Sequence, residues 1–136
     1  MTLQLHATPE EVMRAVEALQ EFALGEGLPE KTIHHLALAL EECASNIVNH
    51  ALKRDPTKEF RVTVQRQGER LLIELRDPGP EFDPTAVSGP ISPPRDNLPG
   101  GWGINIVLRY TDGMTYRRNG GENILLLIKN LSDSNP

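Results

Sequence analysis

The sequence LALALEECASNIVNHAL, residues 36 to 52, has the length of a helix and carries a carboxylate and an amide, Glu42 and Asn46. Residues four apart lie on the same face of a helix. The segment before this pair, Leu36 to Leu40, is apolar on every side, which predicts a helix that neighbouring elements cover all round. Polar side chains cost stability in such surroundings. The stretch therefore predicts either a chemical task for Glu42 and Asn46 or a place for Glu42 on the solvated edge of the helix.

The size and charge of the chain limit its function. Its 136 residues suit one domain with its own core, which we expect to span residues 1–131, followed by a flexible polar tail at 132–136. The net charge of −5 and the scattered basic residues argue against nucleic-acid and anionic-membrane partners. One cysteine, Cys43, fits a reducing compartment, and its apolar surroundings predict an inert buried thiol. With no signal-peptide pattern and no run of the ~18 apolar residues that a membrane span needs, we expect a cytoplasmic protein.

The hydrophobic periodicity predicts the order strand, two helices, two strands, a long loop, a helix and two strands. The expected strands cover residues 3–7, 60–65, 71–76, 114–118 and 123–129. The expected helices begin at Pro9 and Pro29, the second running to about Leu52, and a third covers 104–110. This order predicts an α+β fold, a two-layer sandwich in which one mixed, mostly antiparallel sheet carries helices on one face.

Local signals support these elements. Thr8 and Glu11 form the Thr-x-x-Glu pattern of a capping box, which predicts a helix that begins at Pro9. Asn119-Gly120-Gly121 is a strong hairpin signal between the last two strands. The proline-rich segment 78–99 shows little periodicity, and a loop of this length in a small domain is either disordered or a functional lid.

The strand at 71–76 predicts the direction of a third polar residue, Asp77. Leu71, Ile73 and Leu75 share one face of the strand, and Asp77 continues that row toward the layer of the helices. An inward carboxylate at a strand end can accept a hydrogen bond from an exocyclic amine, such as that of adenine. Gly79 would let a flat ring approach the backbone. The alternative is an ordinary Asp-Pro-Gly turn.

Glycines at 100, 101 and 103 surround Trp102 just before the third helix. Without side chains, their backbone N–H groups could face an anion, and the positive end of the helix dipole would add to the attraction. The segment therefore predicts a phosphate site, a hinge at the end of the long loop, or both.

Taken in order, these features resemble the ATP-binding (GHKL or Bergerat) fold shared by gyrase, heat-shock chaperones, histidine kinases and mismatch-repair ATPases. The closest resemblance is to the small anti-sigma-factor serine/threonine kinases of bacterial partner-switching pathways. Residues 42–46 are similar to the first family box, Glu-x-x-x-Asn, residues 77–79 to the second, and Gly101-Trp102-Gly103-Ile104 to the third.

The resemblance implies a Mg-ATP-dependent kinase that phosphorylates an anti-anti-sigma partner with a STAS domain and also sequesters a sigma factor. Glu42 would be the base for the serine hydroxyl of the substrate, and Asn46 would hold Mg²⁺. The family is usually dimeric, and an exposed first strand could pair with its twin across the sheet edge, so we expect a homodimer.

The resemblance also implies a nucleotide site. Asp77 would bind the adenine amino group and Gly79 would line its pocket. Gly101 and Gly103, with Ile104 of the same box, would meet the phosphates. Arg95, the basic residue of the lid, could reach a phosphate or be a solvated surface residue.

The sequence departs from the family pattern at three places. Pro80 stands near a position where a second glycine is frequent, Trp102 separates the glycines of the third box, and Asn123 replaces a threonine that many members carry near the nucleotide. The intact pair of Glu42 and Asn46 nevertheless favours an active kinase.

Two other functions remain open. A nucleotide-gated module could sequester a regulatory partner without phosphoryl transfer, and a detached catalytic domain of a histidine kinase is a weaker third hypothesis. His34, His35 and His50 could suggest a metal site with Glu42, but their spacing matches no zinc pattern.

Overall fold

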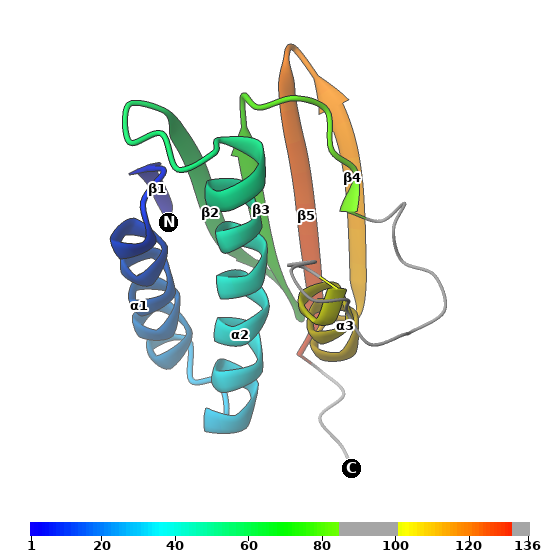
Figure 1. Cartoon of the computed structure of the whole chain (residues 1–136). Helices are drawn as coiled ribbons and strands as arrows, with labels where there is room; N and C mark the ends of the chain where they lie inside the picture. The colour runs from blue at the N-terminus through cyan, green and yellow to red at the C-terminus, as the bar shows by residue number, and fades with distance from the viewer. Residues whose placement is uncertain (85–100, 132–136) are drawn as a thin grey trace.

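The strands form one sheet, and the helices lie against one face of it (Figure 1). The computed structural model describes residues 1–84 and 101–131, and only the backbone of 101–104. The elements are β1 (Thr2–His6), α1 (Pro9–Gly25), α2 (Glu30–Asn46), η1 (Ile47–Ala51), β2 (Glu59–Gln67), β3 (Arg70–Asp77), α3 (Gly101–Tyr110), β4 (Gly113–Asn119) and β5 (Glu122–Asn130).

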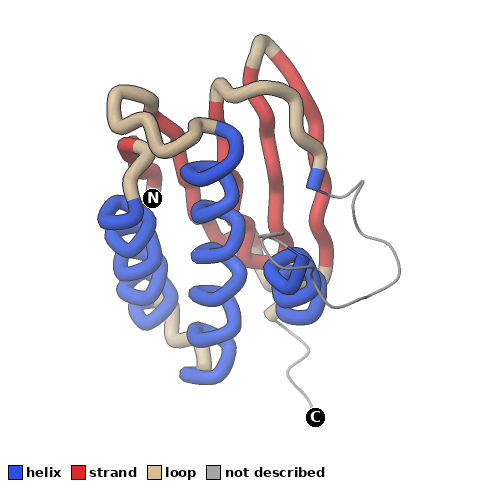
Figure 2. Tube along the Cα trace, viewed as in Figure 1, coloured by secondary structure: helices blue, strands red, loops and turns tan. Residues whose placement is uncertain are grey.

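The strand order is β1-β2-β3-β5-β4, and each neighbouring pair is antiparallel. The helices form the second layer in front of the sheet, with α2 between α1 and α3 (Figure 2). This arrangement confirms the predicted α+β sandwich, although the paired strands include no parallel pair within the described ranges. The predicted lid from residue 85 onward, with Arg95, and the predicted tail at 132–136 lie outside the described residues.

The predicted capping box starts α1, with one change of partner. Thr8 Oγ1 accepts a hydrogen bond from the backbone N–H of Glu11 at 3.2 Å. The Glu11 carboxylate accepts from the N–H of His6 at 3.1 Å rather than from that of Thr8. The N–H of Thr8 already donates to the carbonyl of His6, so the Glu11 carboxylate accepts from the N–H of His6 instead.

The predicted continuous helix to Leu52 changes form after Asn46. Its last turn, η1, is a π-helix, in which the N–H of Leu52 donates to the carbonyl of Ile47 at 2.8 Å. The chain then reverses through Lys53 and Arg54, both with positive φ. The wider turn therefore begins directly beyond one of the predicted site residues, and π turns occur often at functional sites.

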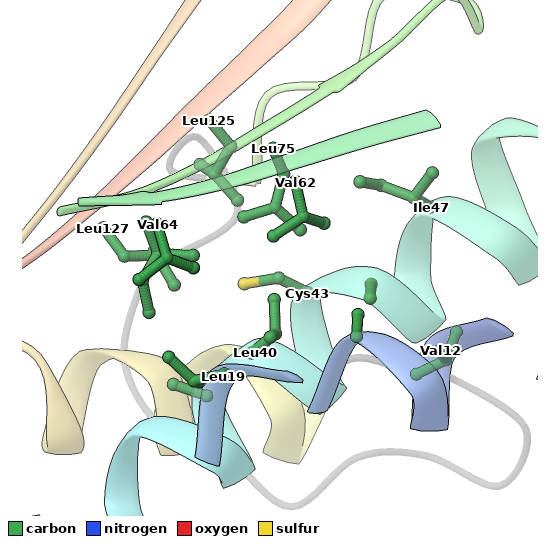
Figure 3. Packing of buried hydrophobic residues seen from close by; sticks show 14 of the residues in the cluster. Val12, Leu19, Leu40, Cys43, Ile47, Val62, Val64, Leu75, Leu125 and Leu127 are labelled. Carbon is green, nitrogen blue, oxygen red and sulfur yellow. The ribbon is translucent and has the colours of Figure 1, made fainter. Parts of the chain in front are cut away.

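The core lies between α2 and the sheet. Cys43 and Ile47 lie on the side of α2 and η1 that faces Val62 and Leu75 of the strands, and Leu40 lies nearer Leu19 of α1 (Figure 3). Cys43 is 3% exposed, and burial raises the pKa of its thiol to about 12. This confirms the prediction of an inert buried cysteine.

The two hairpins confirm the turn signals. Asn119 pairs with Glu122, and the two glycines between them have φ of +61° and +80°, which a two-residue turn with positive φ at both central positions requires. The β2–β3 turn is also short, since Gln67 pairs with Arg70. By contrast, α3 begins at Gly101 rather than at Ile104, so the predicted glycine-rich turn lies partly within the first turn of a helix.

Candidate functional site

A pocket opens between the end of α2 and the strands β3, β5 and β4. It encloses about 430 Å³ of space, part of it open to solvent. The described residues that line it are Cys43, Asn46, Ile47, Ala51, Asp77, Phe82, Pro84, Tyr116, Asn123 and Leu125. Most of this lining is apolar, with a few polar groups at fixed positions, as is usual for small-molecule sites.

Asp77 lines this pocket and points inward, as the side-chain alternation predicted. It is 3% exposed and continues the buried row of Leu71, Ile73 and Leu75. Its Oδ1 accepts hydrogen bonds from the N–H of Gly79 at 2.8 Å and from Nδ2 of Asn123 at 3.0 Å. Both hydrogen bonds that it accepts within the described ranges end on Oδ1, so Oδ2 is available to a ligand.

Two opposing effects act on the Asp77 carboxyl. Burial raises its pKa, while the hydrogen bonds from Asn123 and Gly79 and the charge of Arg118 counter that rise. The result is a pKa above the usual range, because burial is the largest of these effects. A ligand that donates a hydrogen bond to Oδ2 would favour the ionised form.

Gly79 makes a close approach, but to a different neighbour than predicted. A Cβ at this position would lie 2.9 Å from the Cβ and carbonyl oxygen of Ala51 and 2.9 Å from Oδ1 of Asp77. The missing side chain therefore lets the loop after β3 pack directly on η1. The predicted approach of a flat ring to the backbone of Gly79 stays a prediction.

Glu42 and Asn46 lie on α2 and are partly buried. Asn46 lines the pocket, whereas Glu42 is not among the lining residues. Neither side chain makes a hydrogen bond to another residue of the described segments. Burial, and to a lesser degree the neighbouring Glu41, raise the pKa of Glu42, which suits a group that has to take up a proton.

The structure brings Asn46 and Asp77 together around one pocket, and Gly79 lies beside it, where its N–H donates to Asp77. Gly101, Gly103 and Ile104 fall in the first turn of α3, where only the backbone is described. Arg95 lies outside the described residues.

Sequence reasoning missed the central place of Asn123 in the site. It pairs with Asp77 in the β3–β5 register and is 4% exposed. The signal was present, because Asn123 continues the inward row of Leu125 and Leu127 as Asp77 continues that of β3. The hydroxyl of Tyr116, which also lines the pocket, donates to Asn123 Oδ1 at 2.6 Å.

A protein-only metal centre does not form in the described part of the chain. It contains no group of three or more His, Cys, Asp and Glu side chains placed to hold a metal ion. An amide oxygen such as that of Asn46 can still bind Mg²⁺ together with phosphate oxygens and water. Among the described helices, none is long and apolar enough to cross a membrane.

Comparison with known proteins supports the predicted family. The family described as "Histidine kinase-like ATPase domain" matches residues 5–129. The serine/threonine-protein kinase BtrW of Bordetella bronchiseptica is 28% identical over 128 residues, 93% of this chain and 90% of that protein. The serine-protein kinase RsbW of Listeria innocua is 32% identical over 83 residues, and the match spans 61% of this chain and 53% of RsbW.

Solved structures show the same fold at low sequence identity. The RsbU and RsbW domains of a Mycobacterium tuberculosis protein match with a TM-score of 0.69 and 17% identity over 96% of this chain and 32% of that one. The SiaB–SiaC complex of Pseudomonas aeruginosa matches with a TM-score of 0.63 and 11% identity, over 95% of this chain and 88% of that one. The resemblance to the partner-switching kinases is thus confirmed, and the curated relatives of this chain are serine or serine/threonine kinases.

Proposed function

Because the chain belongs to the histidine kinase-like ATPase domain family, we propose that it is a Mg-ATP-dependent serine/threonine kinase that acts on a regulatory protein partner. The substrate is an anti-anti-sigma protein with a STAS domain, and the kinase also sequesters a sigma factor. The similarity to kinases named RsbW and BtrW supports the enzyme class and the partner-switching role.

The observation that carries the proposal is the buried carboxylate of Asp77. One oxygen accepts hydrogen bonds from two N–H donors, which leaves the other available, and the residue lines a largely apolar pocket. An ionised carboxylate in this position accepts a hydrogen bond from the exocyclic amine of adenine, while the apolar lining covers the faces of the ring.

The other end of the pocket suits the phosphates. The amide oxygen of Asn46 would hold Mg²⁺, and its side chain is free of partners within the described segments. When bound, Mg²⁺ neutralises charge on the transferred phosphoryl group. The backbone N–H groups of Gly101 and Gly103 lie in the first turn of α3, where unpaired N–H groups attract anions.

Glu42 is the proposed general base. Its carboxylate takes the proton of the substrate hydroxyl, and its raised pKa makes it a better proton acceptor than an ordinary exposed glutamate. Phosphoryl transfer then depends on positioning this carboxylate more than on covalent chemistry by the protein.

The test is phosphoryl transfer from labelled ATP to a purified STAS-domain protein, sought first among the products of the genes beside that of this chain. Glu42→Ala should lower the transfer rate by a factor of about 10² to 10⁴, the usual contribution of a general base, and leave Mg-ATP binding largely unchanged. Glu41→Ala removes a carboxylate from the adjacent position of α2 and serves as the matched control.

The outcomes separate the two candidate functions. Loss of transfer in Glu42→Ala alone supports the kinase. Wild-type protein that binds Mg-ATP and then the partner, yet transfers no phosphate, would support the nucleotide-gated binding module instead. Loss of Mg-ATP binding in Glu42→Ala would contradict the role of base.

The proposal includes a homodimer in the cytoplasm. β1 is the edge strand of the sheet beside β2, and its free edge offers N–H and C=O groups to a second copy. The single cysteine of the chain, buried and unpaired, suits a reducing compartment. Sedimentation of the purified protein at micromolar concentration tests the dimer.

A further inference from the structure

Asn123 joins three segments that surround the pocket. Its Nδ2 donates to Oδ1 of Asp77 at 3.0 Å and to the carbonyl of Pro80 at 2.8 Å, and it lies 3.5 Å from the carbonyl of Gly79. Its side chain thereby ties β5 to the end of β3 and to the loop that follows β3.

The oxygen of the Asn123 amide, Oδ1, also has its hydrogen-bond partners within the protein. Oδ1 accepts hydrogen bonds from the hydroxyl of Tyr116 at 2.6 Å, from Nη1 of Arg118 at 3.0 Å and from the N–H of Phe82 at 3.2 Å. A guanidinium and a backbone N–H can only donate, and a carbonyl can only accept. These partners fix which end of the amide faces Asp77, so Nδ2 points at the carboxylate and Oδ1 points away from it.

This fixed amide decides how Asp77 is presented to a ligand. With Oδ1 held by the N–H of Gly79 and by Nδ2 of Asn123, the carboxylate is restrained about its Cβ–Cγ bond. The oxygen that remains available is an acceptor, because a donor at Oδ1 stabilises the ionised form.

We propose that Asn123 is the positioning residue that sets base selectivity, because it holds Asp77 as a hydrogen-bond acceptor toward the pocket. The pocket then takes a purine with an exocyclic amino group and rejects one that carries a carbonyl oxygen at that position. This inference rests on the proposed nucleotide-binding function and adds the residue that determines its selectivity.

An aspartate at position 123 would weaken Asp77 as a hydrogen-bond acceptor. Two carboxylates about as close as the present 3.0 Å contact cannot both stay ionised, so they share a proton. Among the other groups near Asp77, Arg118 favours its charge and Glu122 opposes it. The Cys43 thiol in the same pocket stays neutral, since its pKa is raised to about 12. The shared proton lies between the two carboxylates, on the Oδ1 side of Asp77. It removes negative charge from Asp77, so that Oδ2 becomes a weaker acceptor for an amino group and the advantage of ATP over ITP shrinks.

The experiment compares Mg-ATP with Mg-ITP, in which a carbonyl oxygen replaces the amino group, by titration calorimetry on the whole chain. The wild type should bind ATP about 10- to 100-fold more tightly, the value of one hydrogen bond to a charged group. Asn123→Asp should reduce this ratio to about threefold or less at about pH 6.5, with the ratio rising again toward about pH 8.5 as the shared proton is lost. The ratio of the wild type should not change over that range.

Asn119→Asp is the matched control, because it makes the same chemical change at an exposed position of the same hairpin. It should keep the wild-type ratio. If Asn123→Asp does not fold, Asn123→Ala removes the amide without adding a charge or a new donor and should also lower the ratio, but without dependence on pH.

The results separate this inference from the function on which it rests. A wild type that does not distinguish ATP from ITP contradicts base reading by Asp77 and hence the proposed function. A different outcome overturns the role of Asn123 alone. In that outcome the wild type distinguishes ATP from ITP, and Asn123→Asp keeps the wild-type ratio at every pH or Asn123→Ala keeps the wild-type ratio.

Discussion

At the β3 end of the pocket, Asp77 and Asn123 are buried and hydrogen-bonded, whereas at the α2 end Asn46 and Glu42 are partly exposed and make no side-chain hydrogen bond within the described segments. At the β3 end, the protein itself supplies hydrogen-bond partners for the polar side chains. The other presents polar groups that lack partners among the described residues. Both ends belong to a single pocket or border it. They therefore differ in whether the protein itself hydrogen-bonds their polar side chains, and not in their location.

The contrast suggests a division of tasks between the two ends. A hydrogen-bonded and buried carboxylate is preorganised, so that binding a base costs little further ordering. Free amide and carboxylate groups on α2 instead gain their partners from a metal ion, phosphates or a substrate hydroxyl. We therefore expect substitutions at the β3 end to alter both folding and affinity, and substitutions at the α2 end to alter ligand-dependent properties alone.

The largest expected effect on affinity is that of Asp77→Asn. An amide can still accept from Gly79 and Asn123 through one oxygen, but it then points a donor at the base amine. We expect Mg-ATP affinity to fall about 10- to 100-fold, the value of a hydrogen bond to a charged group, as measured by calorimetry.

The same variant should not lose stability. Burial raises the pKa of Asp77, which means that the ionised side chain costs folding free energy that an amide does not. A fall in the free energy of unfolding of Asp77→Asn at neutral pH would contradict this account of the preorganised end.

The next effect is that of Gly79→Ala on folding. The new Cβ would lie 2.9 Å from the carbonyl oxygen of Ala51, and that oxygen cannot move unless η1 moves. We expect a loss of about 1–3 kcal/mol in the free energy of unfolding, typical of overpacking, measured by urea denaturation. Gly25→Ala is the control, because nothing lies within 4 Å of a Cβ there, and it should be neutral or stabilising.

At the α2 end, Asn46→Ala should change ligand binding without the loss of stability expected for Gly79→Ala. Its side chain gives up no hydrogen bond to the described part of the protein, and alanine is a better helix former, so stability should hold or rise. The factor by which Mg²⁺ tightens ATP binding should fall by roughly tenfold, equivalent to about 1.4 kcal/mol. Calorimetry with and without Mg²⁺ measures it, and an equal loss without Mg²⁺ would contradict the metal role.

The sequence was informative where one residue or one periodic row decides the structure. Alternation along β3 predicted the inward Asp77, Thr8 predicted the start of α1, and the paired glycines at 120 and 121 predicted the last hairpin. In each case the physical cause is local, either side-chain parity, a cap or a positive φ.

The features that were missed depend on contacts between distant segments. The π turn of η1 packs against Gly79, nearly thirty residues further along the chain, and its form cannot be read from the helical pattern of residues 36–52 alone. Asn123 gained its importance only when β5 was placed beside β3, because register decides that it faces Asp77. Sequence reasoning had treated it only as a substitute for a threonine.

The smallest expected effect is on the pH dependence of the free energy of unfolding, from which the contribution of the Asp77 carboxyl can be isolated. The folded-state pKa of Asp77 is raised, so its contribution to stability is present below the unfolded pKa of about 3.9 and is lost as the pH rises through the folded value. The amide introduced by Asp77→Asn cannot titrate, so the stability of the wild type relative to this variant should decline over this window and then level off. Urea denaturation of both proteins at a series of pH values measures the difference, in which the other titrating groups largely cancel. A difference that is flat with pH would mean that the hydrogen bonds from Asn123 and Gly79 fully offset burial, and the β3 end would then be preorganised at no electrostatic cost.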